Sequence, residues 1–250
     1  MCLILFAWKK HPKYDLIVAA NRDEFYDRPT QKAHIWPEEV DLIAGKDLKA
    51  GGTWMGISKS GKFAALTNYR DPKHMNPEAP SRGDLTKDFL KKEISPASYL
   101  QEILSENIPY NGFNLLLGDS DSLYYYNNIN NEIKELEAGI YGLSNALLND
   151  PWPKVINGKV KLEEAVSNEN LTPSDLFNIL RDRVIAPDHE LPHTGVPMEW
   201  ERALSSMYIE TENYGTRCST VLIQGVEKTI YSENSHAHLG QKEDQVEFIL

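Results

Sequence analysis

The order of strand-like and helix-like segments limits the folds open to this chain more than any single motif does. Apolar runs at residues 3–8 and 16–20, separated by HPKYD, predict a hairpin at the start of the chain. A second predicted hairpin joins residues 53–58 to 63–67, and Gly61 in its turn suits a positive φ. We therefore expect the first part of the chain to be antiparallel sheet.

Apolar residues at helical spacing occur in two blocks, each of which lies between groups of predicted strands. They predict helices over residues 84–92, 97–106 and 155–166, and Thr172 followed by Pro173 predicts the start of another. A hairpin turning near residues 120–122 and the stretches STVLIQG, EKTIYSE and QVEFIL indicate further strands. Because strands and helices come in blocks, we expect an α+β fold of largely antiparallel sheets with helices packed outside them. No linker or repeat interrupts the chain, so residues 1–250 are predicted to form a single domain.

Charge and cysteine content exclude some classes of function. The 26 Lys and Arg against 37 Asp and Glu give a net charge of -11, which repels phosphate backbones, so no nucleic-acid partner is expected. The apolar run at residues 3–8 is too short to cross a bilayer, and no membrane insertion is predicted. Two cysteines make no disulfide framework, which favours a reducing, cytoplasmic location.

Two segments match catalytic motifs by letter but not by context. HELPH, at residues 189–193, has the letters of a zinc motif, yet Pro192 interrupts the helix that would bring both imidazoles to one face. We expect a surface loop there and no metal. GLSNA, at residues 142–146, resembles a nucleophile elbow, but LLNDP after it is a poor helix start, so a strand end is expected.

Polar residues lie at the ends of the predicted strands at four places. NRDE, at residues 21–24, is predicted to be a turn directly after the first hairpin, which would put Asp23 beside Cys2. The other three are Asn68, just past a predicted strand, Asn145 in LSNA, and Arg217 at the start of a predicted strand. Each alone is typical of a turn, but the set together with Cys2 indicates a candidate site.

Cys2 has two interpretations. Free cysteine is among the most buried residue types, so Cys2 is explained as the first residue of a buried strand. Alternatively, aminopeptidases generally remove Met1 before a small residue, which leaves a thiol and a free α-amine in one residue. The pKa of the amine is about 7.7–8.0 and that of the thiol about 8.5, so the amine can accept the proton of the thiol. Cys218 has no such partner and is predicted to be structural.

The chain resembles the NRDE-domain family, which includes the transport-and-Golgi-organisation proteins. The resemblance covers nearly the whole chain and is carried by MCLILFAW, AANRDEF, the stretch from GGTWMGIS to LTNYRDP, GLSNALLNDPWPKV and YGTRCSTVL. That family is similar, more distantly, to N-terminal-nucleophile hydrolases of the choloylglycine hydrolase and penicillin acylase type. The resemblance implies a four-layer αββα sandwich and an N-terminal cysteine that hydrolyses linear amides.

The resemblance also implies roles for individual residues. It matches Cys2 to the nucleophile, Asp23 to the aspartate that orients the α-amine, and Asn68 to the oxyanion-hole amide. Asn145 matches a second amide near the site, and Arg217 an arginine beside the cysteine.

Four further residues are expected to support the site or to bind substrate: Asn21, Arg22, Glu24 and Tyr69. The hydrolases read Arg-Asn-x-Asp where this chain has Ala20-Asn21-Arg22-Asp23, so alanine stands in the place of their arginine.

The sequence therefore predicts a cysteine amidohydrolase that acts on a small acylated molecule, without a cofactor. The alternative is a non-catalytic binding or trafficking protein for haem, acyl-CoA or lipid-like ligands, as implied for eukaryotic relatives in Golgi organisation. Apolar and aromatic residues near the candidate site favour that alternative, or belong to the core: Phe6, Trp8, Phe25, Tyr69 and Trp152. The oligomeric state is not predicted.

Overall fold

The computed structural model describes residues 2–39, 41–238 and 243–250, which divide into two compact units. The first unit contains the residues up to Asp27 together with Ala138–Leu250, and the second contains Arg28–Glu137. Met1, whose removal the nucleophile interpretation of Cys2 requires, lies outside the described residues. The sheet of the first unit is therefore assembled from both ends of the chain, with the second unit inserted between.

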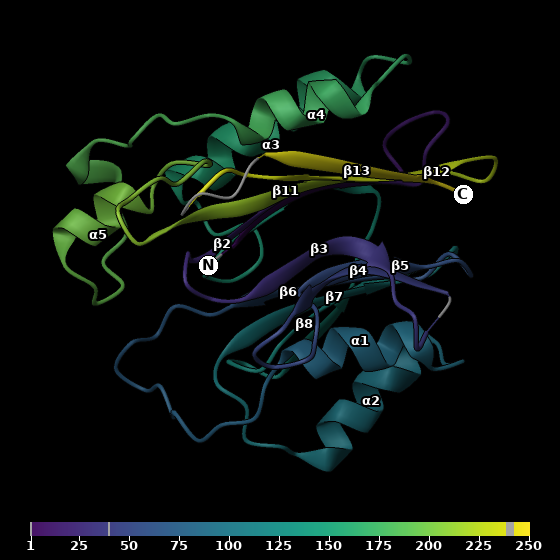
Figure 1. Cartoon of the computed structure of the whole chain (residues 1–250), viewed down its shortest axis with the longest axis horizontal. Helices are drawn as coiled ribbons and strands as arrows, with labels where there is room; N and C mark the ends of the chain where they lie inside the picture. Colours follow the sequence, from purple (N-terminus) through teal and green to yellow (C-terminus); the bar gives the residue numbers. More distant parts are fainter. Residues whose placement is uncertain (1, 40, 239–242) are drawn as a thin grey trace. The chain divides into compact units, whose positions relative to one another are not determined.

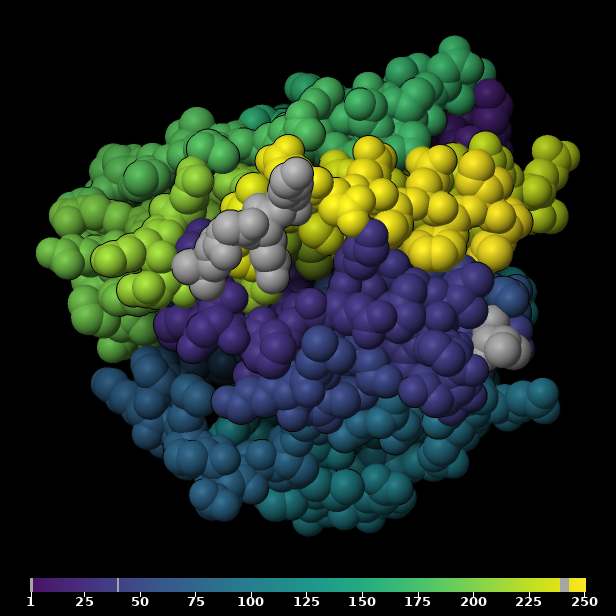
Figure 2. All heavy atoms as spheres, in the orientation of Figure 1, coloured from purple at the N-terminus to yellow at the C-terminus, as the bar shows by residue number. Residues whose placement is uncertain are grey.

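The sheet of the first unit has the strand order β10-β1-β2-β11-β12-β13, and its strand pairs are antiparallel (Figure 1). Its strands are β1 (Cys2–Trp8), β2 (Leu16–Phe25), β10 (Gly139–Leu143), β11 (Tyr214–Gln224), β12 (Thr229–Ser235) and β13 (Asp244–Ile249). The first predicted hairpin is confirmed as β1 and β2. The last strand, β13, is mostly exposed, and Figure 2 shows its yellow atoms at the surface.

Helices α3 (Pro153–Val166) and α4 (Pro173–Leu180) lie along one face of this sheet, which we call the helix face (Figure 1). The predicted start of α4 is confirmed, because Thr172 and Asp175 form a capping box and Pro173 takes the first position. Side chains from both helices join apolar residues of the sheet in one cluster, including Leu3, Leu5, Ala19, Val155, Leu162, Leu176 and Val221. Burial of each leucine or valine contributes roughly 1.5–3 kcal/mol, which holds the helices to the sheet. Two shorter helices follow α4, at η1 (Asp188–Glu190) and α5 (Met198–Ala203).

The NRDE segment is part of a strand, and the predicted turn at residues 21–24 is wrong. Strand β2 continues to Phe25 because β11 pairs with it along its whole length, from Leu16 opposite Gln224 to Phe25 opposite Tyr214. The polar side chains thus alternate between the two faces of the sheet. Asn21 and Asp23 lie on the helix face with Ala19, and Arg22 lies on the opposite face.

A β-bulge interrupts the pairing of β2 with β11. The register shifts between Thr216, opposite Asp23, and Cys218, opposite Arg22, so Arg217 is the extra residue. As a result, Arg217 lies inside a strand. The prediction that it lies at the start of one is wrong.

The sheet of the second unit is a meander in which each strand pairs with the next, in the order β3-β4-β5-β6-β7-β8-β9. Its strands are β3 (Thr30–Ile35), β4 (Leu42–Asp47), β5 (Met55–Ser58), β6 (Phe63–Asn68), β7 (Phe113–Gly118), β8 (Leu123–Asn127) and β9 (Glu132–Glu135). Helices α1 (Gly83–Lys91) and α2 (Pro96–Glu106) pack on it through a cluster that includes Leu66, Phe89, Leu100 and Leu115. Both helices and the β5–β6 hairpin are confirmed, with Gly61 at φ 87. Strands β3 and β4 were not predicted.

The largely antiparallel α+β class predicted from the sequence is confirmed in both units. Within the described part of the chain, no helix has the length and apolar character needed to span a bilayer.

Candidate active site

The backbone of Cys2 is held by the two residues that follow β10. The register of β1 with β10, in which Ile4 lies opposite Leu143, brings these residues to the start of β1. The backbone N–H of Cys2 donates to Asn145 Oδ1 at 3.3 Å, and Ser144 Oγ donates to the Cys2 carbonyl oxygen at 3.0 Å. Asn145 and Ser144 are buried, so this end of β1 has a fixed partner for the nitrogen of Cys2.

Asp23 is a buried carboxylate on the neighbouring strand. Its Oδ1 accepts a hydrogen bond from Thr216 Oγ1 at 2.7 Å, and its backbone oxygen accepts one from the Tyr214 hydroxyl at 2.8 Å. Burial raises the pKa of the Asp23 carboxyl, and the ammonium of Lys154 is the largest influence in the opposite direction. The structure therefore brings Asp23 close to a cation that the sequence analysis did not select.

The thiol of Cys2 lies in a row with Arg22 and Cys218. Arg22 is the Cα partner of Cys2 in β1 and of Cys218 in β11, so the three side chains share the face opposite the helices. Burial raises the pKa of the Cys2 thiol, and the Asp23 carboxylate raises it further, whereas the Arg22 guanidinium lowers it. The thiol thus keeps its proton at neutral pH unless a base removes it.

The two arginines of the site have different surroundings. Arg217 Nη1 donates to the carbonyl oxygen of Phe25 at 2.8 Å, and burial together with the charge of Arg22 lowers the pKa of Arg217. Glu24 Oε1 accepts a hydrogen bond from the backbone N–H of Phe25 at 2.9 Å. Of the two arginines, Arg22 is the one that lies opposite Cys2.

Asn21 uses its side chain to join α4 to the sheet. Its Nδ2 donates to the carbonyl oxygens of Leu180 at 2.9 Å and Met207 at 2.8 Å, and its Oδ1 accepts from Ser219 Oγ at 2.5 Å. The residue is buried on the helix face, away from the row that contains the Cys2 thiol. These contacts indicate a structural role.

Replacing Asn21 with alanine is expected to lower the free energy of unfolding by about 2–4 kcal/mol. The change leaves two backbone oxygens and the Ser219 hydroxyl buried without the amide that pairs with them. Urea denaturation of the purified variant measures the effect, with Asn170→Ala at an exposed position as the control. A loss no larger than that of the control would contradict the structural role.

Asn68 and Tyr69 belong to the second unit. Asn68 is the last residue of β6, opposite Phe113 of β7, and the backbone N–H of Tyr69 donates to the Gly112 oxygen at 2.9 Å. The first unit by itself brings together Cys2, Asp23, Asn145, Arg22 and Arg217.

Two residues at the site were missed by the sequence analysis. Lys154, the second residue of α3, is 2% exposed, and Thr216 is bonded to Asp23. A cation in the first turn of a helix is unfavourable beside the helix dipole, which was a usable signal for Lys154. Thr216 gave no such signal, because it lies opposite Asp23 only as a result of the register shift at Arg217.

His236 forms a buried chain with Ser219 and Asn21. Because the Ser219 hydroxyl donates to Asn21, the His236 Nε2–H donates to Ser219 Oγ, at 2.8 Å. Burial lowers the pKa of His236 to about 4, so the ring is neutral in the folded protein at neutral pH.

Acidification is expected to destabilise the protein through His236. A histidine with a lowered pKa contributes stability above its unfolded value of about 6.5, and the contribution is lost as the pH falls through about 4. The full contribution is roughly 3 kcal/mol. Between pH 7 and pH 4, the melting temperature should fall less steeply in His236→Gln than in wild type. The exposed His189→Gln is the control, and equal slopes in all three proteins would refute the role of His236.

The HELPH segment is an exposed 3-10 turn followed by coil, as expected for a surface loop. In residues 2–39, 41–238 and 243–250, no cluster of three or more His, Cys, Asp or Glu side chains could hold a metal ion. Strand β10 ends within GLSNA, and no helix follows directly. The prediction of a strand end there, in place of a nucleophile elbow, is confirmed.

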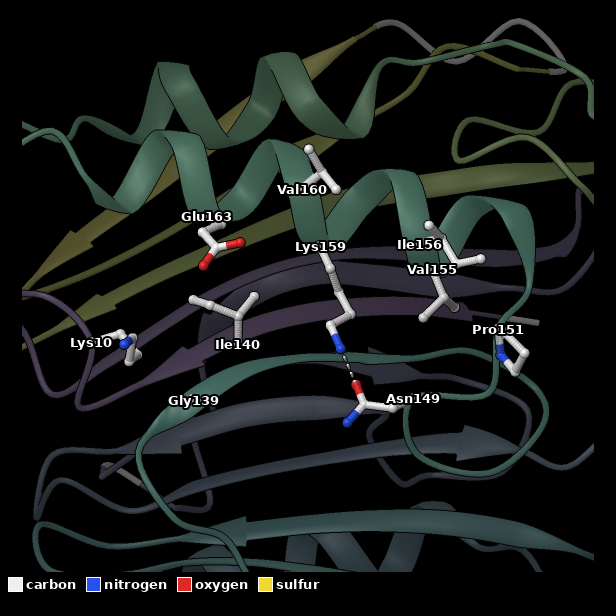
Figure 3. A pocket seen from close by; sticks show the side chains of 10 residues that line it. All are labelled: Lys10, Gly139, Ile140, Asn149, Pro151, Val155, Ile156, Lys159, Val160 and Glu163. Carbon is white, nitrogen blue, oxygen red and sulfur yellow. Dashed lines mark hydrogen bonds between the residues drawn. The ribbon is translucent and has the colours of Figure 1, made fainter.

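A groove of about 460 Å³ runs between α3 and β10 in the first unit (Figure 3). Lys159 donates to Asn149 Oδ1 at 2.9 Å on its wall, and Lys10 and Glu163 also line it. Its lining contains none of the site residues named above, so it is separate from the candidate active site.

Comparison with known proteins identifies the family. Residues 1–237 match the family model described as Transport and Golgi organisation 2. The chain belongs to this family. It is 38% identical over 244 residues to the Transport and Golgi organization 2 homolog of Mus musculus, covering 89% of this chain and 88% of the mouse protein. It is 31% identical over 260 residues to Transport and Golgi organization protein 2 of Drosophila melanogaster, covering 92% and 90% of the two chains.

Solved structures show what fold this Transport and Golgi organisation 2 family member has. It is similar to a mutant of the conjugated bile acid hydrolase from Clostridium perfringens, with a TM-score of 0.58, 11% identity, and 98% and 92% of the two chains covered. It is also similar to the Caenorhabditis elegans ortholog of N-acylethanolamine-hydrolyzing acid amidase, with a TM-score of 0.54, 12% identity, and 98% and 100% covered. The predicted family and the N-terminal-nucleophile hydrolase-like fold class are therefore confirmed.

Proposed function

We propose that this member of the Transport and Golgi organisation 2 family is an N-terminal-nucleophile cysteine amidohydrolase that cleaves a linear C–N amide bond of a small acylated molecule. The observation that carries the proposal is the environment of the Cys2 nitrogen. This nitrogen donates to buried Asn145. The residue opposite Cys2 in the strand pair is Arg22, and the buried carboxylate of Asp23 comes directly after it in β2. A cysteine that served only as a buried strand residue would need neither group.

In the proposed first step, the α-amine of Cys2 accepts the proton of the thiol, and the thiolate attacks the amide carbonyl carbon. The raised pKa of the thiol makes such a base necessary, and an α-amine with a pKa near 7.7–8.0 suits the task at neutral pH. Asn145 and Asp23 orient the amine, and the charge of Arg22 favours the thiolate.

The tetrahedral intermediate carries its negative charge on the former carbonyl oxygen, which the Asn68 amide stabilises, as the sequence resemblance implies. Collapse of the intermediate breaks the C–N bond. The leaving amine takes the proton from the α-ammonium, and a thioester remains on Cys2. Water, deprotonated by the same α-amine, then hydrolyses the thioester and releases the carboxylic acid.

The test compares two forms of the full chain that differ by one residue. A fusion protein cleaved to leave Cys2 first has the free α-amine, and a matched form with one alanine before Cys2 keeps the thiol but lacks that amine. Intact mass verifies both forms, and a panel of N-acyl amides is assayed for release of amine. We expect hydrolysis only with the first form. Equal activity in both forms, or no activity in either across the panel, would refute the proposal.

The alternative is a binding or trafficking role for haem, acyl-CoA or lipid-like ligands. The transport and Golgi organization in the names of the relatives is in keeping with a trafficking role, and names no ligand. Two of the aromatic residues that motivated it, Phe6 and Trp8, are buried in the core, and Phe6 stacks on Tyr141. Saturable binding of haem or acyl-CoA by both forms of the chain, without amide hydrolysis, would favour this alternative.

A further inference from the structure

We propose that Lys154 is a positioning residue of the candidate active site, where its buried ammonium offsets the charge of Asp23 so that the α-amine of Cys2 is oriented without being held protonated. This inference rests on the proposed function, because it concerns the amine that acts there as the base. It adds a role for a residue of α3.

Helix α3 places Lys154 in the layer between helix and sheet. Gly158 lies so close to β1 that a Cβ on it would be 2.6 Å from Leu5 Cδ1, and a Cβ on Gly142 would be 2.7 Å from Val155 Cγ1. These contacts fix the first turn of α3 beside the end of β10, a few residues before Asn145. Lys154 is 2% exposed, and its Nζ is buried.

Asp23 points into the same layer. Its neighbour two residues back, Asn21, contacts the end of α4 from the helix face, and strand alternation puts Asp23 on that face too. The Asp23 side chain is 1% exposed. Two buried groups of opposite charge therefore lie on one side of the sheet at the Cys2 end of β1.

The chemistry of burial requires this pairing. A lysine loses favourable hydration when it is buried, and it stays charged only beside an opposite charge. Its place in the first turn of α3 adds the unfavourable positive end of the helix dipole. The Lys154 ammonium is also the largest influence that lowers the pKa of the Asp23 carboxyl, with Arg22 as a smaller one from the opposite face.

The pairing has a consequence for the base. A buried carboxylate with the α-amine as its only cationic neighbour would raise the pKa of that amine and keep it protonated at neutral pH. Such an ammonium could orient the site but could not accept the thiol's proton. A second cation on the same carboxylate cancels this effect, because Lys154 neutralises Asp23 and repels a proton on the amine.

The experiment titrates Cys2 directly. The chain has two cysteines, so protein labelled with 13C-cysteine gives two sets of signals, and buried Cys218 serves as an internal reference. A protease-cleaved fusion supplies the full chain with Cys2 first, whatever the host does with Met1. The Cα shift of Cys2 is followed from pH 5 to 10 in wild type, Lys154→Met and Lys154→Arg.

We expect the amine midpoint of Lys154→Met to rise by about one pH unit relative to wild type. Lys154→Arg, which keeps the charge, should stay within a few tenths of a unit of wild type. A midpoint that is unchanged or lowered in folded Lys154→Met would overturn the proposal, since a merely structural lysine would change the melting temperature and not the titration.

A second variant covers the case in which Lys154→Met does not fold. In Asp23→Asn the carboxylate is gone and Lys154 remains beside the amine, so the midpoint should fall below that of wild type. An unchanged or raised midpoint there would also overturn the proposal. None of these readings needs a substrate, so failure of the proposed amide hydrolysis is seen separately, in the amide panel.

Discussion

Cys2→Ala is expected to abolish amide hydrolysis, with a loss of about four orders of magnitude or more in kcat. The change removes the sulfur that forms the thioester in the proposed mechanism. The backbone hydrogen bonds of this position with Asn145 and Ser144 do not involve the sulfur, so alanine can keep them and the fold should change little. Release of amine from the best substrate of the panel measures the loss, and circular dichroism verifies the fold.

Cys218→Ala is the matched control for that experiment. Cys218 lies in the same row of the sheet, on the other side of Arg22, and burial and the nearby Glu233 raise the pKa of its thiol well above the usual value. Its removal should leave hydrolysis within a few-fold of wild type. If Cys2→Ala and Cys218→Ala were equally active, catalysis by the Cys2 thiol would be ruled out.

Asn68→Ala is expected to lower kcat by about 100- to 1,000-fold, which corresponds to a loss of about 2.7–4 kcal/mol of transition-state stabilisation. The reason is that an amide donor to the oxyanion, the role proposed for Asn68, acts mainly in the transition state, so KM should change much less than kcat. Steady-state kinetics on the same substrate separates the two constants.

The control for Asn68→Ala is Asn130→Ala, which makes the same chemical change at an exposed position of the second unit. It should match wild type in both constants. A rise in KM with an unchanged kcat in Asn68→Ala would assign Asn68 to substrate binding and contradict its role at the oxyanion.

Local patterns were sufficient to predict much of the fold. The HPKYD breaker between two apolar runs predicted the β1–β2 hairpin and thereby the neighbourhood of Cys2 and Asp23. Periodic leucines predicted α1 and α2, and Thr172-Pro173 predicted the start of α4. Each of these signals lies within a few residues of the element it specifies. The single-domain organisation and the roles of the individual site residues stay predictions.

Long-range pairing accounts for what the sequence did not reveal. NRDE looks like a turn because charged residues seldom continue an apolar strand, yet β11, almost 200 residues later, extends β2 through it. Likewise, β9 and β10 are neighbours along the chain but belong to different sheets, and only the pairing of β10 with β1 brings Asn145 to Cys2. The environment of Lys154 depends on how α3 packs, which its apolar spacing does not encode.

The bulge at Arg217 also restricts how this protein can change over evolutionary time. Before it, Thr216 faces the helices with Asp23, and after it, Ser219 faces them with Asn21, so one extra residue reverses the alternation of β11. Deleting Arg217 itself would leave Thr216 opposite Asp23 and Cys218 opposite Arg22 in one regular ladder, whereas deleting a residue between 219 and 224 would turn the side chains on one side of the deletion to the wrong face. Away from the bulge, insertions and deletions should therefore be absent from β11 in functional relatives, whereas substitutions that keep its length are tolerated more readily.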